Sequence, residues 1–159
     1  MDLALKKRAL RLFTYGLYAV TCVQGDDINA FTANWLTQVS FEPPLVAVSI
    51  ENDAKSLPMI QGSGKFAINV LHSGEGQREF AGALGKSASK HPDKMQGVAY
   101  DLQEGYVVLQ DGLGWVGCEV RQSVPSGDST LVIAEVVAAG IVAEGQPLTM
   151  NEAGFRHAG

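Results

Sequence analysis

A cation, a hydroxyl group and free backbone N–H groups meet in the segment Asn52-Asp53-Ala54-Lys55-Ser56. Pro58 indicates that a helix begins here, because proline is tolerated in a first turn, where its missing N–H would have had no partner. Ser56 is the expected N-cap. A helix N-terminus attracts anions through its unpaired N–H groups and its dipole. The segment is therefore a candidate phosphate site; the alternative is an ordinary capped helix.

A second polar segment, Thr32-Ala33-Asn34-Trp35-Leu36-Thr37-Gln38-Val39-Ser40, comes just before the strand breaker Pro43-Pro44. Small and hydroxyl-bearing residues interleave with amides here. A strand over these residues would leave its backbone approachable and offer several hydrogen-bond donors and acceptors. The alternative is a solvent-facing strand with a packed Trp35.

Two glycine motifs resemble nucleotide-binding patterns in residue type but lack the structural context or a residue that those patterns require. Gly112-Leu113-Gly114-Trp115-Val116-Gly117 matches the dinucleotide fingerprint, which must join a strand to a helix. Residues 118–124 continue instead as a strand, so we predict a turn and a strand start. Gly85-Lys86-Ser87 resembles the end of a P-loop, but Phe80 stands where the first glycine is required. A Rossmann site and an ATPase are therefore not supported.

Metal-binding and hydrolase motifs are missing from the sequence. His72, His91 and His157 lie far apart, and no H-E-x-x-H or C-x-x-C spacing occurs. No serine lies in a G-x-S-x-G elbow. We therefore expect no metal site and no acid, base or nucleophile constellation.

The composition narrows the possible partners. The chain has 159 residues and a net charge of −5, which argues against nucleic-acid binding, because phosphate recognition needs a basic face. The one basic cluster, at residues 6–11, is interpreted as the solvated side of a helix whose other side carries Leu5, Ala9, Leu12 and Phe13. No apolar run is long enough to span a membrane.

Two cysteines, Cys22 and Cys118, lie inside apolar runs and lack the spacing of a ligand pair. We therefore expect both thiols to be buried and reduced, and the protein to be cytoplasmic.

Hydrophobic periodicity predicts a mostly β protein with a few short helices. We expect helices over residues 2–13, from about 56 onward and over 75–84. Strands are expected at 15–23, 28–40, 45–50, 66–71, 98–109, 116–124 and 130–142. No linker or repeat interrupts the chain, so residues 1–159 are interpreted as a single domain. Several strands at short spacing favour an antiparallel barrel.

An ordered set of segments resembles the FMN-binding split-barrel flavin reductase family, which includes flavoredoxin and the flavin-reductase portion of high-molecular-weight rubredoxins. The matching segments are Tyr15-Gly16-Leu17-Tyr18-Ala19-Val20-Thr21, residues 29–35 and 39–48, Asn52 to Ser56, residues 65–71, Phe80-Ala81-Gly82, Gly127-Asp128 and Ala134-Glu135-Val136. The resemblance runs in chain order over nearly the whole sequence.

The resemblance implies a six-stranded antiparallel split β-barrel that forms a homodimer, with flavin near the subunit interface. It implies FMN as the cofactor, with FAD as the alternative. The residues implied to bind it are Thr32, Ala33, Asn34, Trp35, Thr37, Ser40, Asn52, Asp53, Lys55, Ser56, Phe80, Ala81 and Gly82.

Two positions depart from the family pattern. Ser129 stands where many relatives carry a histidine close to the nicotinamide, and it is the residue we expect to contact that ring. The C-terminal segment, often aromatic in relatives, has Asn151, Phe155, Arg156 and His157.

The expected function is that of an NAD(P)H-dependent flavin reductase, which passes electrons to free flavin, a partner flavoprotein or a rubredoxin-like iron protein. Hydride transfer needs stacking of two rings more than a titrating side chain. The alternative is a non-enzymatic FMN electron carrier reduced by a protein partner.

Overall fold

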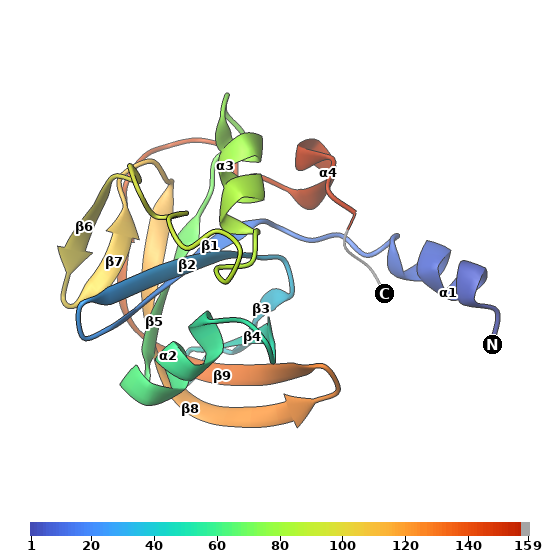
Figure 1. Ribbon diagram of the computed structural model, residues 1–159, viewed down its shortest axis with the longest axis horizontal. Helices are drawn as coiled ribbons and strands as arrows, with labels where there is room; N and C mark the ends of the chain where they lie inside the picture. The colour runs from blue at the N-terminus through green and yellow to red at the C-terminus, as the bar shows by residue number, and fades with distance from the viewer. Residues whose placement is uncertain (157–159) are drawn as a thin grey trace.

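The computed structural model describes residues 1–156 of the chain, so His157 lies outside the described residues. The elements follow in the order α1 (Leu3–Leu10), β1 (Tyr18–Gln24), β2 (Asp27–Ala33), β3 (Leu36–Ser40), β4 (Leu45–Glu51), α2 (Ser56–Ser63), β5 (Lys65–Val70), α3 (Gln77–Leu84), β6 (Tyr100–Gln103), β7 (Tyr106–Leu109), β8 (Gly114–Ser126), β9 (Ser129–Ile141) and α4 (Met150–Ala153) (Figure 1). The prediction of a mostly β fold with short helices is confirmed.

The main sheet has seven strands in the order β2-β1-β5-β8-β9-β4-β3, and β6 and β7 form a separate two-stranded sheet. Each pairing between neighbouring strands is antiparallel. The six-stranded barrel expected from the resemblance is not what the described residues form, because β2 and β3 are the two edges of an open sheet. The predicted strand at residues 28–40 is interrupted at Asn34 and Trp35, which adds the seventh strand.

The strand predicted at residues 98–109 also divides in two. Glu104 and Gly105 both adopt positive φ angles, 53° and 83°, and turn the chain back on itself. Glycine tolerates this conformation without steric cost, which makes the pair a tight hairpin turn. The resulting β6–β7 hairpin packs beside β5, where Gly117 of β8 leaves room for the Tyr106 ring. A Cβ atom at Gly117 would lie only 2.6 Å from that ring.

Two hydrophobic clusters stabilise the sheet. The larger one lies between α2 and the sheet, with Val20, Val48, Ile60, Phe66 and Val132 at its centre. The second lies under α3 and α4 and includes Leu17, Leu71, Leu84 and Leu148. Burial of each large aliphatic side chain contributes about 1.5–3 kcal/mol. Together the clusters fix α2 and α3 against the sheet.

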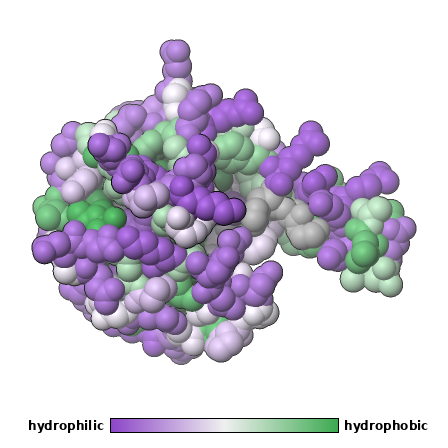
Figure 2. All heavy atoms as spheres, viewed as in Figure 1, coloured by the Kyte–Doolittle hydropathy of each residue, from purple (hydrophilic) through white to green (hydrophobic). Residues whose placement is uncertain are grey.

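The N-terminal arm, residues 1–13, differs from the predicted helix. Its helix begins as predicted, since the Asp2 carboxylate accepts from the Ala4 N–H at 2.8 Å. However, α1 ends at Leu10 and buries none of its residues. Leu5, Leu12 and Phe13 are 59%, 80% and 60% exposed, and the arm extends away from the rounded body (Figures 1 and 2). The apolar side of the predicted amphipathic helix therefore has no cover among the described residues.

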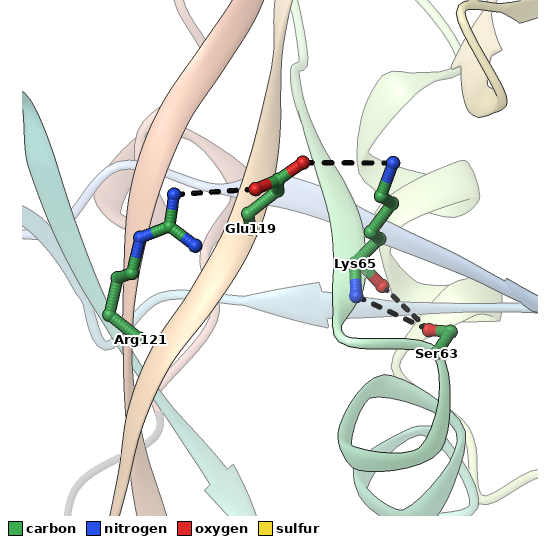
Figure 3. Close-up of polar contacts among 4 residues, drawn as sticks. All are labelled: Ser63, Lys65, Glu119 and Arg121. Atoms are coloured by element: carbon green, nitrogen blue, oxygen red, sulfur yellow. Dashed lines mark hydrogen bonds and ion pairs between the residues drawn. The ribbon is translucent and has the colours of Figure 1, made fainter.

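A polar network crosses the strands β5, β8 and β9, and Figure 3 shows its part on β5 and β8, from Lys65 through Glu119 to Arg121. Lys65 pairs with Glu119 at 3.7 Å, and Arg121 lies 3.3 Å from Glu119 and 2.9 Å from Glu135. Hydrogen bonding to Glu135 raises the pKa of the Arg121 guanidinium. The charges compensate one another across the sheet, so this network has a structural role in register.

No helix among residues 1–156 is both long enough and apolar enough to cross a membrane.

Candidate functional site

A cavity of about 710 Å³ opens between β2, the start of α2, the end of α3 and the C-terminal segment. Its lining comes from Leu17, Asn29, residues 31–35, 49–51, 53–56, 81–82, 85–89, Lys94, Met150 and residues 154–156. Segments distant in sequence are thus brought to one place by the sheet and by α3. Cavities of roughly 300–1,000 Å³ are the usual size for cofactor sites.

The lining combines apolar and cationic side chains with neutral polar ones and with the carboxylates of Glu51 and Asp53. Leu17, Phe31, Ile50 and Phe155 provide apolar and aromatic surface. Lys55, Lys86 and Lys94 provide three ammonium groups. This combination suits a ligand that has a flat apolar part and an anionic part.

Nine of the fourteen predicted site residues line the cavity: Thr32, Ala33, Asn34, Trp35, Asp53, Lys55, Ser56, Ala81 and Gly82. The other five, Thr37, Ser40, Asn52, Phe80 and Ser129, are not among its lining residues. Thr37 and Ser40 lie on the edge strand β3. Phe80 packs against the second hydrophobic cluster.

The start of α2 differs from the predicted cap. Lys55 occupies the N-cap position and makes no side-chain cap hydrogen bond. Ser56 is the first helical residue and is only 1% exposed. Its hydroxyl accepts a hydrogen bond of 2.8 Å from the Asn29 amide. The prediction of Ser56 as N-cap is therefore wrong by one residue, because its side chain turns to β2 instead of back to the helix.

Lys55 has a carboxylate partner. Its ammonium lies 2.8 Å from the nearer oxygen of Asp27, which stands at the start of β2. The two side chains are 45% and 53% exposed, so the pair is solvent-screened and contributes only about 0–1 kcal/mol.

Contacts between β2 and α3 hold the side of the cavity together. The Thr32 hydroxyl donates to the Ala81 carbonyl oxygen, and the Asn34 amide lies 3.4 Å from the Met150 sulfur. Gly85 ends α3 where space is limited, since a Cβ atom there would lie 3.3 Å from the Ala81 oxygen. These contacts fix α3 at hydrogen-bonding distance from the edge strand.

Ser129 belongs to the neighbouring β8–β9 hairpin, and Asn52, in the turn after β4, contacts that hairpin. The Asn52 side chain accepts from the Thr130 hydroxyl at 2.8 Å and donates to the Gly127 carbonyl at 3.3 Å. Ser129 is 3% exposed, and its hydroxyl donates to Asp128 at 3.1 Å. Asn52 therefore braces the hairpin turn against β4.

The loop after α3 is the part of the site that the sequence did not indicate. Lys86, Ser87 and Ser89 line the cavity. The motif Gly85-Lys86-Ser87 matches only the end of a P-loop, so it did not predict this position. Lys94 lies farther along this loop and has no motif around it. Its ammonium donates to the carbonyl oxygens of Leu84 and Lys86, both at 3.0 Å.

Burial lowers the pKa of Lys94. The Cys22 thiol raises it in part, and the positive charge of Lys55 lowers it further. The Lys94 ammonium thus lies within electrostatic range of Lys55 and of the β1–β2 wall.

Cys22, Cys118 and His72 are not among the residues that line the cavity. Cys22 and Cys118 are free and buried, as predicted. Burial raises the pKa of Cys22 to about 11 and that of Cys118 to about 12, so both thiols are protonated near neutral pH. His72 accepts from the Gly74 N–H and contacts Asp111. Residues 1–156 contain no cluster that could hold a metal ion.

A mostly antiparallel sheet with a cavity that combines an apolar wall with several ammonium groups is the arrangement expected of a β domain that binds a flat, anionic cofactor. The relatives identify it further. The chain belongs to the flavin reductase-like domain family, whose sequence profile matches residues 10–159.

Individual relatives agree with this assignment. The reductase component of 4-hydroxyphenylacetate 3-monooxygenase from Thermus thermophilus is 32% identical over 94% of this chain and 93% of its own length. High molecular weight rubredoxin from Moorella thermoacetica is 32% identical over 89% of this chain, which spans 62% of that relative. The structure of the Streptomyces globisporus NADH:FAD oxidoreductase SgcE6, in complex with NAD and FAD fragments, has a TM-score of 0.83 and 25% identity, covering 99% of this chain and 93% of that one.

Proposed function

We propose that this chain binds FMN in the cavity and reduces it with NADH or NADPH, passing the electrons to free flavin or to a partner redox protein. The observation that carries the proposal is the cavity itself, which offers apolar and aromatic side chains together with Lys55, Lys86 and Lys94. An isoalloxazine ring requires the first and a phosphate requires the second.

The residues present fit a flavin. Leu17, Ile50 and Phe155 provide apolar surface for a ring, and Thr32 to Trp35 provide a polar strand end beside it. The hydroxyl of Thr32 is already directed to Ala81. Backbone groups of residues 32–35 are therefore the proposed partners of the ring edge, with the Asn34 amide beside them.

When bound, the flavin would supply the hydride and electron chemistry, which no side chain here replaces. The protein's residues bind, orient and exclude water. Met150 and Phe155 line the C-terminal side of the cavity, and the Thr32–Ala81 hydrogen bond joins its β2 and α3 walls. Hydride transfer depends on the stacking distance of the two rings more than on a titrating side chain.

The names of the relatives support the choice of donor and acceptor. One is an NADH:FAD oxidoreductase, another is the reductase component of a monooxygenase, and a third is a high molecular weight rubredoxin. We propose a nicotinamide donor and either free flavin, a partner flavoprotein or an iron protein as acceptor. FAD is the alternative cofactor.

We also propose that the protein is a cytoplasmic homodimer. We propose in addition that its main sheet has the curved arrangement of a split barrel. Leu5, Leu12 and Phe13 of the arm are exposed, and so are Val39 and Phe41 at the sheet edge, by 51% and 89%. These apolar side chains exceed what an isolated chain of this size normally leaves in water. A second copy would cover them.

Anaerobic mixing of the flavin-loaded protein with NADH and with NADPH tests the function. We expect the visible flavin absorbance to bleach with at least one nucleotide. If dithionite bleaches the flavin and neither nucleotide does, the non-enzymatic electron carrier replaces the reductase. Matched measurements with FMN and FAD decide the cofactor.

A further inference from the structure

We infer that a second, smaller pocket beside the flavin cavity binds the adenosine end of the nicotinamide donor, and that Arg11 and Arg156 make NADPH the preferred donor. This inference rests on the proposed function, because it names the donor of the same reaction. The arm pocket, as we call it, has a volume of about 340 Å³ and is lined by Leu10, Arg11, Phe13, Tyr15, residues 150–151 and residues 154–156. This volume is enough for a small ligand fragment.

Backbone hydrogen bonds hold the two sides of the arm pocket together. The Met150 N–H donates to the Tyr15 carbonyl oxygen at 3.0 Å, so the start of α4 lies beside the end of the arm. Gly154 ends α4 with a φ of 69°, and the Phe155 N–H donates back to the Met150 carbonyl oxygen at 3.1 Å. Glycine adopts this left-handed turn without steric cost. The chain therefore folds back after α4 and brings Arg156 to the same pocket as Arg11.

The arm pocket adjoins the flavin cavity near the start of α3. Met150 and residues 154–156 line both spaces. A Cβ atom at Gly154 would lie 3.7 Å from the guanidinium of Arg78, which belongs to the first turn of α3. Lys94 bonds instead to the carbonyl oxygen of the last residue of this helix. A dinucleotide whose nicotinamide ring stacks on the flavin can therefore extend into the arm pocket, away from Lys94.

The arm pocket is cationic. Arg11 and Arg156 line it, and none of its described lining residues is acidic, although the chain has 17 acidic and 12 basic residues. Among residues 1–156 neither guanidinium has an ion-pair partner. The acidic residue closest in sequence to Arg156 is Glu152, whose carboxylate accepts from the Thr149 N–H at 3.0 Å and from the Thr149 hydroxyl at 2.8 Å. Both arginines are therefore available to an anionic ligand.

Aromatic rings complete the lining of the arm pocket. They belong to Phe13, Tyr15 and Phe155, and the centroids of the Phe13 and Tyr15 rings lie 6.5 Å apart at an interplanar angle of 48°. Purine bases stack on aromatic faces, and the planar guanidinium group binds phosphate in a bidentate manner. Rings and arginines together suit an adenosine that carries phosphate.

The substituent on the adenosine ribose distinguishes the two donors. A site that favours NADH commonly places a carboxylate on the ribose 2′-OH, whereas an arginine accommodates the 2′-phosphate of NADPH. The described lining residues of the arm pocket include two arginines and no carboxylate. A phosphate monoester carries about −1.5 to −2 charges at pH 7, which the two guanidinium groups would compensate. The arm pocket should therefore bind NADPH more tightly than NADH.

The first test measures binding without any reaction. Calorimetric titration of the FMN-loaded protein compares adenosine 2′,5′-bisphosphate with 5′-AMP, which lacks the 2′-phosphate. We expect the bisphosphate to bind about ten-fold or more tightly, as for the gain of one charge-assisted contact. Combining Arg11→Gln with Arg156→Gln should remove this difference. Arg8→Gln is the matched control, because Arg8 is exposed, lies on the same arm and does not line the pocket.

The second test uses stopped-flow reduction of the bound flavin. In the double variant the apparent dissociation constant of NADPH should rise about ten-fold and that of NADH less than about three-fold. The limiting rate of reduction should not change, because the arginines contribute binding energy that is the same in the ground state and the transition state. Lysine at both positions keeps the charge and should retain part of the preference. Sedimentation of each variant should match that of the wild type, which excludes altered assembly as the cause.

Three results would overturn the inference. The first is equal affinity of the wild-type protein for the two adenosine nucleotides, and the second is a preference that the double variant keeps. The third is a selective loss of FAD binding relative to FMN in the double variant, which would assign the arm pocket to the adenosine of the flavin.

Failure of the proposed function looks different. If dithionite bleaches the bound flavin and neither nucleotide does, the reductase assignment is wrong, and the choice of donor fails with it. If both nucleotides reduce the flavin with equal apparent affinity, the reductase stands and the assignment of Arg11 and Arg156 alone is wrong.

Discussion

The Lys55 ammonium and the Asp27 carboxylate lie 2.8 Å apart at the edge of the cavity, joining the start of α2 to the start of β2. The pair is half-exposed, which limits its strength to about 0–1 kcal/mol. Asp27 nevertheless pairs with Lys55, so a bound phosphate would have to compete with this carboxylate for the Lys55 ammonium.

Asp27→Asn should therefore strengthen FMN binding by about two- to five-fold, because up to 1 kcal/mol of competition is removed. Riboflavin binding should not change. Asp26→Asn is the control, since it removes the same charge one residue away and Asp26 makes no ion pair among the described residues. An equal gain in the control would indicate long-range electrostatics instead of release of Lys55. Equilibrium titration at low and high salt measures both.

Tyr106→Phe should leave the free energy of unfolding unchanged or raise it by about 1 kcal/mol. The Tyr106 ring is 4% exposed and its hydroxyl has no hydrogen-bond partner among the described residues. Removing an unsatisfied buried polar group relieves its desolvation cost. Phenylalanine also keeps the ring that faces Lys65 at 5.7 Å. Urea unfolding provides the measurement, and a loss above 1 kcal/mol would reveal a partner for the hydroxyl.

The buried thiols should make stability fall at alkaline pH. An unfolded cysteine loses its proton near its ordinary pKa of 9.0, whereas burial raises the pKa of Cys22 to about 11 and of Cys118 to about 12. The folded state thus retains protons that the unfolded state has lost. This contribution is complete below pH 9 and disappears as the pH rises toward 11 and 12.

Each thiol contributes a slope of up to about 1.4 kcal/mol per pH unit in that window. Unfolding of wild type and Cys118→Ala at pH 8, 9 and 10 should show a shallower decline for the variant. Parallel curves would mean that Cys118 titrates alike in both states.

Replacing apolar residues of the N-terminal arm should weaken the proposed homodimer. Leu5→Asp together with Leu12→Asp places charges on side chains that are 59% and 80% exposed in the isolated chain, so the fold itself should survive. Sedimentation should then show monomers at a concentration where the wild type is dimeric. Lys7→Gln, also on the arm, is the control and should remain dimeric. A monomeric wild-type protein would refute the proposal directly.

Ser129→Ala should change the rate of flavin reduction by NADH less than two-fold. The Ser129 side chain is 3% exposed and bonded to Asp128, and it is not part of the cavity lining. Stopped-flow reduction provides the rate. A ten-fold or greater decrease would restore Ser129 as the nicotinamide contact that the resemblance implied.

Local patterns predicted many of the elements well. The apolar run at residues 45–50 became β4, and the runs beginning at residues 66 and 116 became β5 and β8. Such runs are determined by burial on a sheet, and burial leaves a direct trace in residue type. The interruption at Asn34 and Trp35 left no such trace, because neither residue is a breaker like proline. Together with the turn at Glu104 and Gly105, this interruption makes nine strands among residues 1–156 where seven were predicted.

The site was predictable only in part, for a related reason. Thr32 to Trp35 and Lys55 could be found because each lies in a segment with its own chemical character. Lys94 lies in a loop with no motif around it, and its place in the cavity lining comes with hydrogen bonds to carbonyl groups eight and ten residues earlier. The exposure of the arm could not be predicted either. An amphipathic pattern indicates that one side of a helix is covered, but it does not indicate whether the same chain or another chain covers it.

The order of the strands also governs when the cavity can form during folding. Val48 of β4 pairs with Val132 of β9, and the lining runs from Leu17 to the residues after α4. Contacts this distant in sequence close slowly, so we expect a cavity lined by both ends of the chain to be completed late in folding. A flavin would then find nothing to bind until the chain is nearly native. Bound cofactor should slow unfolding in proportion to its affinity while leaving the refolding rate untouched.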